Sequence, residues 1–277
     1  MPEGWVWDET LFSGAAPYYL RGRLPYPGAL HDVFQAATRL EGAPRLIDVG
    51  CGPGIVALAL ADLFAEVVGV DPDAAMLAEA ERLAVARGVA NATWVRMRAE
   101  ELPAGLGPFR YATFAQSFHW MDREVVAKLI FDMLEPGGAF VHVNGVVADP
   151  PPAPAMPFPP PPDAAIQELV SSYLGLVRRA GQGHLRHGTP GDEWGVLRRA
   201  GYRPARVALV PGRRVLEASI EDIVAMVFSA SGTAPHLFGD RLPAFEAELR
   251  ALLQAASDHG RFSRWQGDIQ LDIYERP

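Results

Sequence analysis

Strand-like and helix-like segments alternate along the chain from residue 45 to about residue 148. The strand candidates are short, nearly continuous apolar runs, as expected of strands that are buried on both faces of a sheet. They are residues 45–50, 66–71, 92–97, 110–116 and 139–147, and the helix candidates between them are 55–64, 73–88 and 122–134. Because strict alternation is typical of a parallel sheet with helices on both faces, the sequence predicts a doubly wound α/β fold.

The alternation stops at a proline-rich stretch, DPPPAPAMPFPPPPD at residues 149–163. A run this rich in proline forms neither a helix nor a central strand, and we expect it to be extended, largely as polyproline II. It could be an inert linker or a semi-rigid arm that carries a lid over a site. Beyond it, the sequence predicts helices at 164–181, 192–202, 219–231 and 242–260 and strands at 204–216 and 265–277.

The 277 residues carry a formal net charge of −8 and contain no dense run of Lys or Arg. This balance disfavours nucleic acid as a partner, because proteins usually bind its phosphates with a basic patch. Cys51 is the only cysteine, so no intramolecular disulfide can form. The apolar stretches are too short to span a membrane, and the N-terminus lacks the basic start and apolar core of a signal peptide. We therefore expect a cytoplasmic protein that binds neither nucleic acid nor membranes.

A glycine-rich turn, LIDVGCGPG at residues 46–54, joins the first strand candidate to the first helix candidate. Glycines let the backbone turn tightly and let a ligand approach without a Cβ in the way, and the helix N-terminus that follows favours polar or anionic groups. The spacing is G-x-G-x-G, with Gly54 one residue earlier than in a dinucleotide fingerprint and Ile55 in the fingerprint position. A nicotinamide cofactor is therefore disfavoured, although such turns also occur for packing alone.

Asp71 ends the second strand candidate, 21 residues after Gly50. A carboxylate in this place can accept hydrogen bonds from both hydroxyls of a ribose. The alternative is that Asp71 caps the helix that follows, with Pro72 at the first helical position. The turn, the spacing and the strand end together favour the ribose.

Four segments in this order resemble the successive motifs of class I S-adenosylmethionine-dependent methyltransferases, of the small-molecule kind often grouped as methyltransferase type 11. They are LIDVGCGPG (46–54), VVGVDPDAAML (67–77), VRMRAEELP (95–103) and FRYATFAQSFHWMD with LEPGGAFVHV (109–143). The resemblance covers about residues 10–148. It implies a Rossmann-like, seven-stranded, mainly parallel sheet with its last two strands near the C-terminus, and S-adenosylmethionine as the cofactor.

The resemblance also implies roles for particular residues. The glycine turn would wrap the methionine part of the cofactor with Asp48 close to its amino group, Asp71 would hold the ribose, and the next motifs would contact adenine and the amino acid end. The residues so implied are Asp48, Gly50, Cys51, Gly52 and Gly54 for methionine, Asp71 for ribose, Pro72, Met76, Ala99 and Glu100 for adenine, and Gln116, Ser117 and Phe118 for the amino acid end. Arg98 stands where the family commonly has Asp, so a backbone N–H or Glu100 could supply the contact to adenine instead.

The stretch YYLRGRLPYP, residues 18–27, resembles the family's Tyr/Arg/Pro segment that folds over the cofactor. Tyr18, Tyr19 and Arg23 are therefore candidate cofactor contacts. The same tyrosines and prolines could instead pack the N-terminal arm onto the domain.

SFHWMD, residues 117–122, follows the fourth strand candidate, where ligands of an open parallel sheet bind. Methyl transfer needs a positioned nucleophile and, for a hydroxyl, a base that works near neutral pH. His119 could remove that proton, or it could pack against or cap the next helix. Trp120 would form a pocket wall or shield the sulfonium, because a cation favours an aromatic face.

Extra helices form a cap over the substrate in many relatives, and aromatic residues of the later segments are candidate walls or cap core. We expect an N-terminal arm and cofactor-binding core at 1–148, a proline-rich arm and helical cap insert at 149–190, and the last core strands with further cap helices at 191–277. The candidate walls are Tyr173, Trp194, Met226, Phe228 and Phe238.

These observations favour methyl transfer to an O- or N-centre of a small organic metabolite or natural product, with no metal ion. A protein that binds S-adenosylmethionine but catalyses a rearrangement, or serves as an interaction partner, would have the same cofactor motifs. A nucleic-acid methyltransferase is disfavoured by the acidic balance and by the lack of an Asn/Asp-Pro-Pro-aromatic motif after the fourth strand. Nothing in the sequence indicates an oligomeric state.

Overall fold

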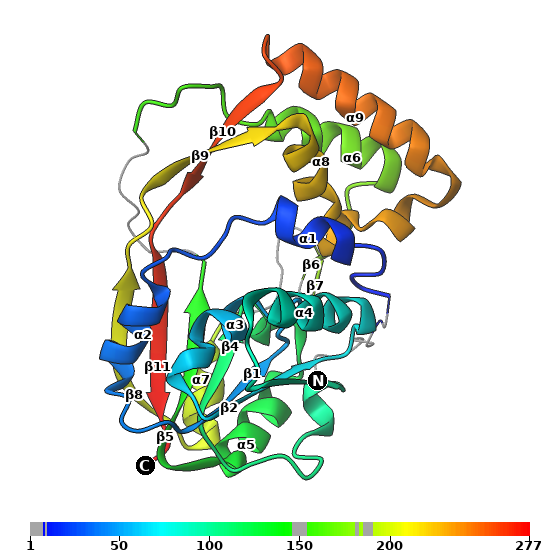
Figure 1. Cartoon of the computed structure of the whole chain (residues 1–277). Coiled ribbons are helices and arrows are strands. Elements are labelled where there is room, and N and C mark those ends of the chain that lie inside the picture. The colour runs from blue at the N-terminus through cyan, green and yellow to red at the C-terminus, as the bar shows by residue number, and fades with distance from the viewer. Residues whose placement is uncertain (1–7, 9, 146–153, 181–182, 185–190) are drawn as a thin grey trace.

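A seven-stranded sheet is the centre of the chain in a computed structural model, which describes residues 8, 10–145, 154–180, 183–184 and 191–277 (Figure 1). The strands β1 to β5 run parallel, and β11 lies antiparallel between β5 and β8. The predicted doubly wound, seven-stranded and mainly parallel sheet is therefore confirmed. The order is β3 (Ala92–Arg96), β2 (Glu66–Asp71), β1 (Arg45–Val49), β4 (Phe109–Ala115), β5 (Leu134–Asn144), β11 (Ile269–Glu275) and β8 (Arg203–Val210).

Neighbouring residues of the central strands point to opposite faces, and separate helices cover each face. One face packs against α2 (Leu30–Thr38), α3 (Ile55–Leu60) and α4 (Ala74–Arg87), where Leu46 of β1 is fully buried. The other face packs against α5 (Arg123–Met133) and α7 (Glu193–Ala200), where Ile47 is fully buried. None of the helices in the described ranges is long and apolar enough to cross a membrane.

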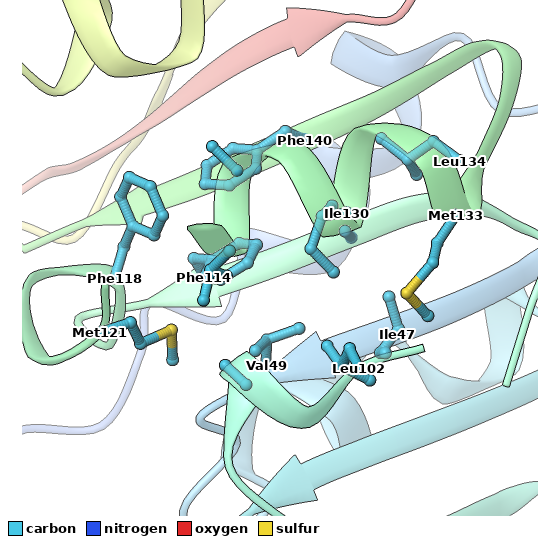
Figure 2. Close-up of a cluster of buried hydrophobic side chains, with 14 of the residues drawn as sticks. Ile47, Val49, Leu102, Phe114, Phe118, Met121, Ile130, Met133, Leu134 and Phe140 are labelled. Carbon is cyan, nitrogen blue, oxygen red and sulfur yellow. The ribbon is translucent and has the colours of Figure 1, made fainter. Parts of the chain in front are cut away.

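Three phenylalanine rings form the centre of the cluster under α5 (Figure 2). Phe114 stacks on Phe140 with ring centroids 4.2 Å apart, and Phe118 meets each of them edge-on at 5.2 Å. All three side chains are fully buried. Because Phe118 lies just beyond the end of β4, this cluster fixes the segment that carries His119 and Trp120.

A helical cap stands beyond the carboxyl ends of the parallel strands (Figure 1). It contains α1 (Ala16–Gly22), α6 (Asp163–Leu174), α8 (Ile220–Phe228) and α9 (Leu242–Ala256). Phe228, Phe238 and Phe245 form its buried centre, with centroid separations from 4.0 to 6.0 Å. The N-terminal helix α1 packs closely on α8, since a Cβ on Gly22 would lie 2.2 Å from the Ala225 carbonyl oxygen.

A two-stranded ribbon, β9 (Arg214–Ser219) and β10 (Arg261–Gln266), connects the cap to the sheet. β9 continues the line of β8, and β10 leads into β11, as Figure 1 shows. The predicted strands 204–216 and 265–277 are therefore wrong as single strands, because each is split between two sheets. The break comes where Gly212 meets Gly267, since a Cβ on Gly212 would lie 2.0 Å from the Gly267 carbonyl oxygen.

The predicted helix 164–181 is too long. The helix α6 ends at Leu174, because Gly175 adopts a positive φ of 79° that leaves the helical conformation. Further along, β6 (Arg179–Ala180) pairs with β7 (Gly183–His184) in a short hairpin. This hairpin begins directly after Arg178.

Part of the proline-rich stretch is described, from residue 154, and it forms no helix or strand up to α6. Phe158 N–H donates to the Ser263 hydroxyl at 3.0 Å, and Ser263 N–H donates to the Pro159 carbonyl at 2.9 Å. This segment therefore lies along β10 of the cap. Residues 149–153 lie outside the described ranges, and the arm's role as a lid stays a prediction.

We expect Phe114→Ala to lower the free energy of unfolding by about 3 to 5 kcal/mol, because it leaves a cavity between Phe118 and Phe140. Urea unfolding followed by circular dichroism measures this change. Val85→Ala on α4 is the matched control, because Val85 is 73% exposed and its loss should change stability little. A loss below about 1 kcal/mol for Phe114→Ala would show that this cluster does not hold the β4 end.

Candidate functional site

The carboxyl ends of β1, β2 and β4 open into a cleft, which we call the inner cleft. It encloses about 820 Å³ of open space, its mouth included. A segment before α1 contributes to its wall with Leu11 and Phe12. The predicted site residues that line it are Tyr19, Gly50, Gly52, Asp71, Pro72, Met76, Ala99, Glu100, Gln116, Ser117 and Trp120.

The glycine loop after β1 is held against the end of β2 by its own backbone. The N–H groups of Gly50 and Cys51 both donate to the Val70 carbonyl, at 2.8 and 3.0 Å, and Gly52 N–H donates to Asp71 Oδ2 at 2.8 Å. Gly50 and Gly52 adopt φ values of 67° and 53°, which side chains other than glycine rarely adopt. A Cβ on Gly50 would lie 2.6 Å from Ser117 Cβ, whereas one on Gly52 would meet open space. A ligand can therefore approach the loop closely at Gly52.

The use of these N–H groups decides which ligand the loop fits. A pyrophosphate would bind free N–H groups at a helix N-terminus. Here Gly54 N–H donates to the Cys51 carbonyl at 3.0 Å, and the three N–H groups before it are already bonded to Val70 and Asp71. The loop therefore offers carbonyl oxygens and close approach, which fit an ammonium group better than a pyrophosphate.

Asp48 lies beneath this loop and does not line the cleft. Its side chain is fully enclosed, and Oδ1 accepts a hydrogen bond from the Thr113 hydroxyl at 2.7 Å. Burial raises the pKa of Asp48 to about 6. Its predicted influence on the cofactor's amino group would therefore be electrostatic, exerted through the loop.

Asp71 lies on the cleft wall at the end of β2. Its Oδ1 accepts from Asp73 N–H at 2.9 Å and its Oδ2 from Gly52 N–H, and burial raises the pKa of the carboxyl to about 6. The helix α4 is capped by Asp73, whose carboxylate accepts from Ala75 N–H and Met76 N–H. The alternative in which Asp71 caps this helix is therefore wrong. A carboxylate has about four acceptor positions, so both Asp71 oxygens can still accept from a ribose.

An apolar slot lies beyond Asp71, formed by Pro72, Met76, Met97 and Ala99. Its shape and apolar lining fit a flat base such as adenine. Glu100 also lines the cleft, but Oε1 accepts from Asp122 N–H at 2.8 Å and Oε2 lies 3.4 Å from Arg98 Nη2. Glu100 would thus contact adenine only in addition to these protein groups.

The segment after β4 places its three predicted contacts differently. Gln116, at a positive φ of 55°, is exposed and lines the cleft. Ser117 also lines it and donates its hydroxyl to the Val49 carbonyl at 2.6 Å. Phe118 is fully buried in the phenylalanine cluster, so the predicted cofactor contact of its side chain is wrong.

Two members of the glycine turn have packing roles. Gly54 is the N-cap of α3, and a Cβ there would lie 2.5 Å from the Trp94 ring. The Cys51 thiol is buried, and burial raises its pKa well above the ordinary value, so it is no nucleophile. The predicted wrapping of a ligand by Cys51 and Gly54 can involve only their backbone.

The predicted N-terminal contacts separate into two groups. Tyr19 lines the cleft, and the Arg23 guanidinium lies 5.2 Å from the Tyr19 ring and donates to the Ser229 carbonyl at 2.8 Å. Tyr18 instead packs into the cap, with its ring centroid 5.1 Å from that of Phe228. The predicted cofactor contact of Tyr18 is therefore replaced by the alternative that the sequence left open, packing of the arm.

A second cleft, the outer cleft, lies between the cap and the strand ends and encloses about 1810 Å³ of open space with its mouth. It shares Phe12, Tyr19, Gln116 and Trp120 with the inner cleft. Phe12 meets Trp120 edge-on at 5.7 Å, so these two rings lie where the two spaces adjoin. The outer cleft is also lined by Arg23, Tyr26, Ile55, His119, Gly145, Gln167, Arg178, Ser231, Thr233 and Gln266.

His119 lies on the core side of the outer cleft. Burial lowers the pKa of its imidazole, an effect that the Glu193 carboxylate opposes. Glu193 stands at the start of α7, and its Oε2 lies 2.9 Å from His142 Nδ1. His119 is therefore a neutral imidazole at neutral pH with a carboxylate–histidine pair in its surroundings.

Of the predicted wall residues, Trp120 lines the outer cleft, whereas Phe238 is buried and Met226 partly buried in the cap. Tyr173 lines a smaller neighbouring hollow, which shares Arg178 with the outer cleft, and its hydroxyl donates to Glu248 at 2.7 Å. Phe228 is fully buried in the cap. Trp194 stacks on Tyr274 outside both clefts, with centroids 5.6 Å apart. The substrate contacts predicted for Phe228 and Trp194 are thus replaced by packing.

Sequence reasoning missed several lining residues. Leu11 and Phe12 form an apolar pair just before the recognised arm, and Met97 directly follows a strand, so local signals existed for these three. Arg178 and Glu193 gave no local signal, because they come from segments far along the chain. Arg178 lines the outer cleft, and the charge of Glu193 acts on His119.

Residues 46–138 match a family described as a methyltransferase domain. Solved structures share the fold across most of the chain. A Bacillus halodurans protein assigned to the methyltransferases is 19% identical, with a TM-score of 0.51 over 90% of this chain and 98% of its own. The YcgJ protein of Bacillus subtilis is 20% identical, with a TM-score of 0.50 over 89% and 99%. The (4+2)-cyclase SpnF is 22% identical, with a TM-score of 0.53 over 92% and 84%. No curated protein matched the sequence.

We expect Asp71→Ala to weaken binding of S-adenosylhomocysteine at least about tenfold, because two ribose hydrogen bonds worth about 1 kcal/mol each are lost. Isothermal titration calorimetry measures the change. Asp132→Ala removes an exposed carboxylate that pairs with Lys128 on α5, and it should bind like the unmodified chain. Unchanged affinity of Asp71→Ala would refute the assigned role.

The raised pKa of Asp71 predicts a pH dependence of the same binding. Only the ionised carboxylate accepts from both ribose hydroxyls, so affinity should fall as the pH drops through 6, to about tenfold weaker at pH 5 than at pH 7. Asp71→Asn cannot titrate and should lose most of this dependence. Titrations at both pH values that agree within about twofold for the unmodified chain would contradict the prediction.

Proposed function

We propose that this chain, whose residues 46–138 match a methyltransferase domain, is a class I S-adenosylmethionine-dependent methyltransferase that methylates an O- or N-centre of a small organic acceptor held in the outer cleft. The observation that carries the proposal is that the two clefts adjoin and share part of their lining. Phe12, Tyr19, Gln116 and Trp120 face both spaces, so a cofactor in one and an acceptor in the other would meet there.

The residues of the inner cleft fit S-adenosylmethionine. The loop at Gly52 admits a close approach, Asp71 offers two acceptors for the ribose, and the slot at Met76 is apolar. When bound, the cofactor supplies an electrophilic methyl group on a sulfonium. Trp120 and Tyr19 would stabilise that cation with their ring faces and exclude water from it.

His119 is the candidate base on the acceptor side. A neutral imidazole can accept the proton of an acceptor hydroxyl as its oxygen is methylated. Because burial lowers the pKa of His119, the imidazole is ready in its neutral form at pH 7. Glu193 would favour the imidazolium that follows, since its negative charge lies close by.

The form of the outer cleft supports a small acceptor. It is enclosed between the cap and the core, and its walls come from both. This arrangement, together with the acidic net charge of −8, supports a metabolite or natural product over a nucleic acid.

A rearrangement catalyst that binds S-adenosylmethionine is the second candidate, because the fold is shared with the (4+2)-cyclase SpnF. Product analysis separates the two. The chain is incubated with S-adenosylmethionine carrying a trideuterated methyl group and a fractionated metabolite extract, and mass spectrometry follows S-adenosylhomocysteine and labelled products. A labelled product supports methyl transfer. An isomerised product without S-adenosylhomocysteine would support the rearrangement catalyst and contradict methyl transfer.

With an oxygen acceptor so identified, we expect His119→Gln to lower kcat about a hundredfold or more while S-adenosylhomocysteine binding stays within about twofold. In the unmodified chain the rate should fall as the pH drops below the lowered pKa of His119, because the imidazolium cannot accept a proton. The variant should lose this acidic limb. His31→Gln, at an exposed pair with Asp32 on α2, is the control. A variant with the normal rate and pH profile would show that His119 is not the base.

A further inference from the structure

Arg178 stands in the outer cleft with its positive charge unmatched. Its Nη2 donates to the Gln167 side-chain oxygen at 2.8 Å, and its Nε is enclosed without a hydrogen-bond partner. The side chain is partly buried, and this burial lowers the pKa of the guanidinium, which nonetheless stays charged. Among the described residues, no carboxylate forms an ion pair with it.

Several other arginines of the chain form an ion pair with a carboxylate. Arg21 pairs with Asp222 at 2.6 Å, Arg199 with Glu124 at 2.6 Å, and Arg213 with Asp268 at 2.8 Å. These pairs lie at more exposed arginines, where water already screens the charge. Arg178 is the more desolvated cation, and a partly desolvated cation without an anion costs free energy.

The outer cleft is built without acidic groups. None of the described residues that line it is Asp or Glu, although the chain as a whole carries 33 of them. The arginines among these described residues are Arg23 and Arg178. Arg23 lies against Tyr19 at the border with the inner cleft, where the cofactor is expected. Arg178 also lines the hollow beside Tyr173, whose lining includes Asp8.

The guanidinium of Arg178 lies on the side of the outer cleft that the cap forms. It directly precedes β6, which Figure 1 shows beneath the cap helices, and Gln167 holds it from α6. His119, Gln116 and Trp120 line the same cleft from the strand ends of the core. An acceptor that spans the cleft would thus have one end at His119 and the other at Arg178.

We propose that the acceptor carries an anionic group, a carboxylate or a phosphate, that binds Arg178 while its nucleophilic end faces His119. This inference rests on the proposed function and specifies its substrate class. The anion supplies the missing partner of the guanidinium through a charge-assisted hydrogen bond, which is stronger than a bond between neutral groups. The same contact fixes how far the nucleophilic end of the acceptor lies from Arg178 and in which direction that end points.

Binding of simple probes tests the proposal. The chain is saturated with S-adenosylhomocysteine and titrated with 4-hydroxybenzoate, 4-hydroxyphenyl phosphate and the neutral 4-hydroxybenzamide. Isothermal titration calorimetry reports binding, and intrinsic tryptophan fluorescence is followed in parallel. We expect at least one anion to bind about tenfold or more tighter than the amide, and Arg178→Gln to abolish that difference. The stronger of the two anions identifies the group. Arg178→Lys should restore part of the preference, since it keeps the charge.

Two controls separate the outcomes. Gln167→Ala removes the neighbour that holds Arg178 and keeps the charge, so it should weaken anion binding less than Arg178→Gln. S-adenosylhomocysteine affinity should be unchanged in every variant. If the unmodified chain does not bind S-adenosylhomocysteine, the proposed function is overturned. Normal S-adenosylhomocysteine binding with no preference for either anion, or an acceptor whose turnover is unaffected by Arg178→Gln, would overturn the anion proposal alone.

Discussion

The functional geometry depends on how the loop after β1 is bonded to the end of β2. The N–H groups of Gly50, Cys51 and Gly52 are all directed to Val70 and Asp71, over distances of 2.8 to 3.0 Å. This pairing continues along β2 past the last residue of β1 and uses the donors that a phosphate would need. It leaves an opening at Gly52 and holds the Asp71 carboxylate in place on the cleft wall. The backbone hydrogen bonds of the loop thus favour one kind of ligand, independently of the side chains that contact it.

This arrangement places two carboxylates, Asp48 and Asp71, in buried positions, and burial raises the pKa of each to about 6. Since the pKa of each is higher in the folded chain than the ordinary 3.8, the folded state binds more protons between about pH 4 and 6. Stability therefore falls as the pH rises through that window, and above it each ionised carboxylate costs about 2 to 3 kcal/mol. A ligand that hydrogen-bonds to Asp71 would recover part of that cost, so binding and folding are coupled at this residue.

The sequence predicts the core well because its signals are local. Apolar runs bounded by turns predicted β1 and β2 to within a residue, and the spacing of Gly50 and Asp71 predicted which strand ends form the site. Prediction failed where packing across the chain decides the structure. The apolar pattern predicts one strand through Gly267, yet the close contact of Gly267 with Gly212 divides that strand in two. Phe118 has the same sequence signal as the cleft residues next to it, although the rings of Phe114 and Phe140 enclose its side chain. The charge of Arg178 in the outer cleft is equally non-local, because the cap helix α6 and the strand ends of the core form the two walls.

The break at Gly212 and Gly267 also has a consequence for how the sequence of such a chain can evolve. Val210 and Ile269 are paired neighbours in the sheet, so residues 211–268 leave and re-enter it at adjacent positions. The whole excursion, with β9, α8, α9 and β10, could be exchanged for another of any length without altering the register of β8 and β11. The glycine loop and Asp71 lie at the ends of β1 and β2, which this excursion does not include. In this architecture, the segment that supplies part of the outer cleft lining can vary separately from the glycine loop and Asp71.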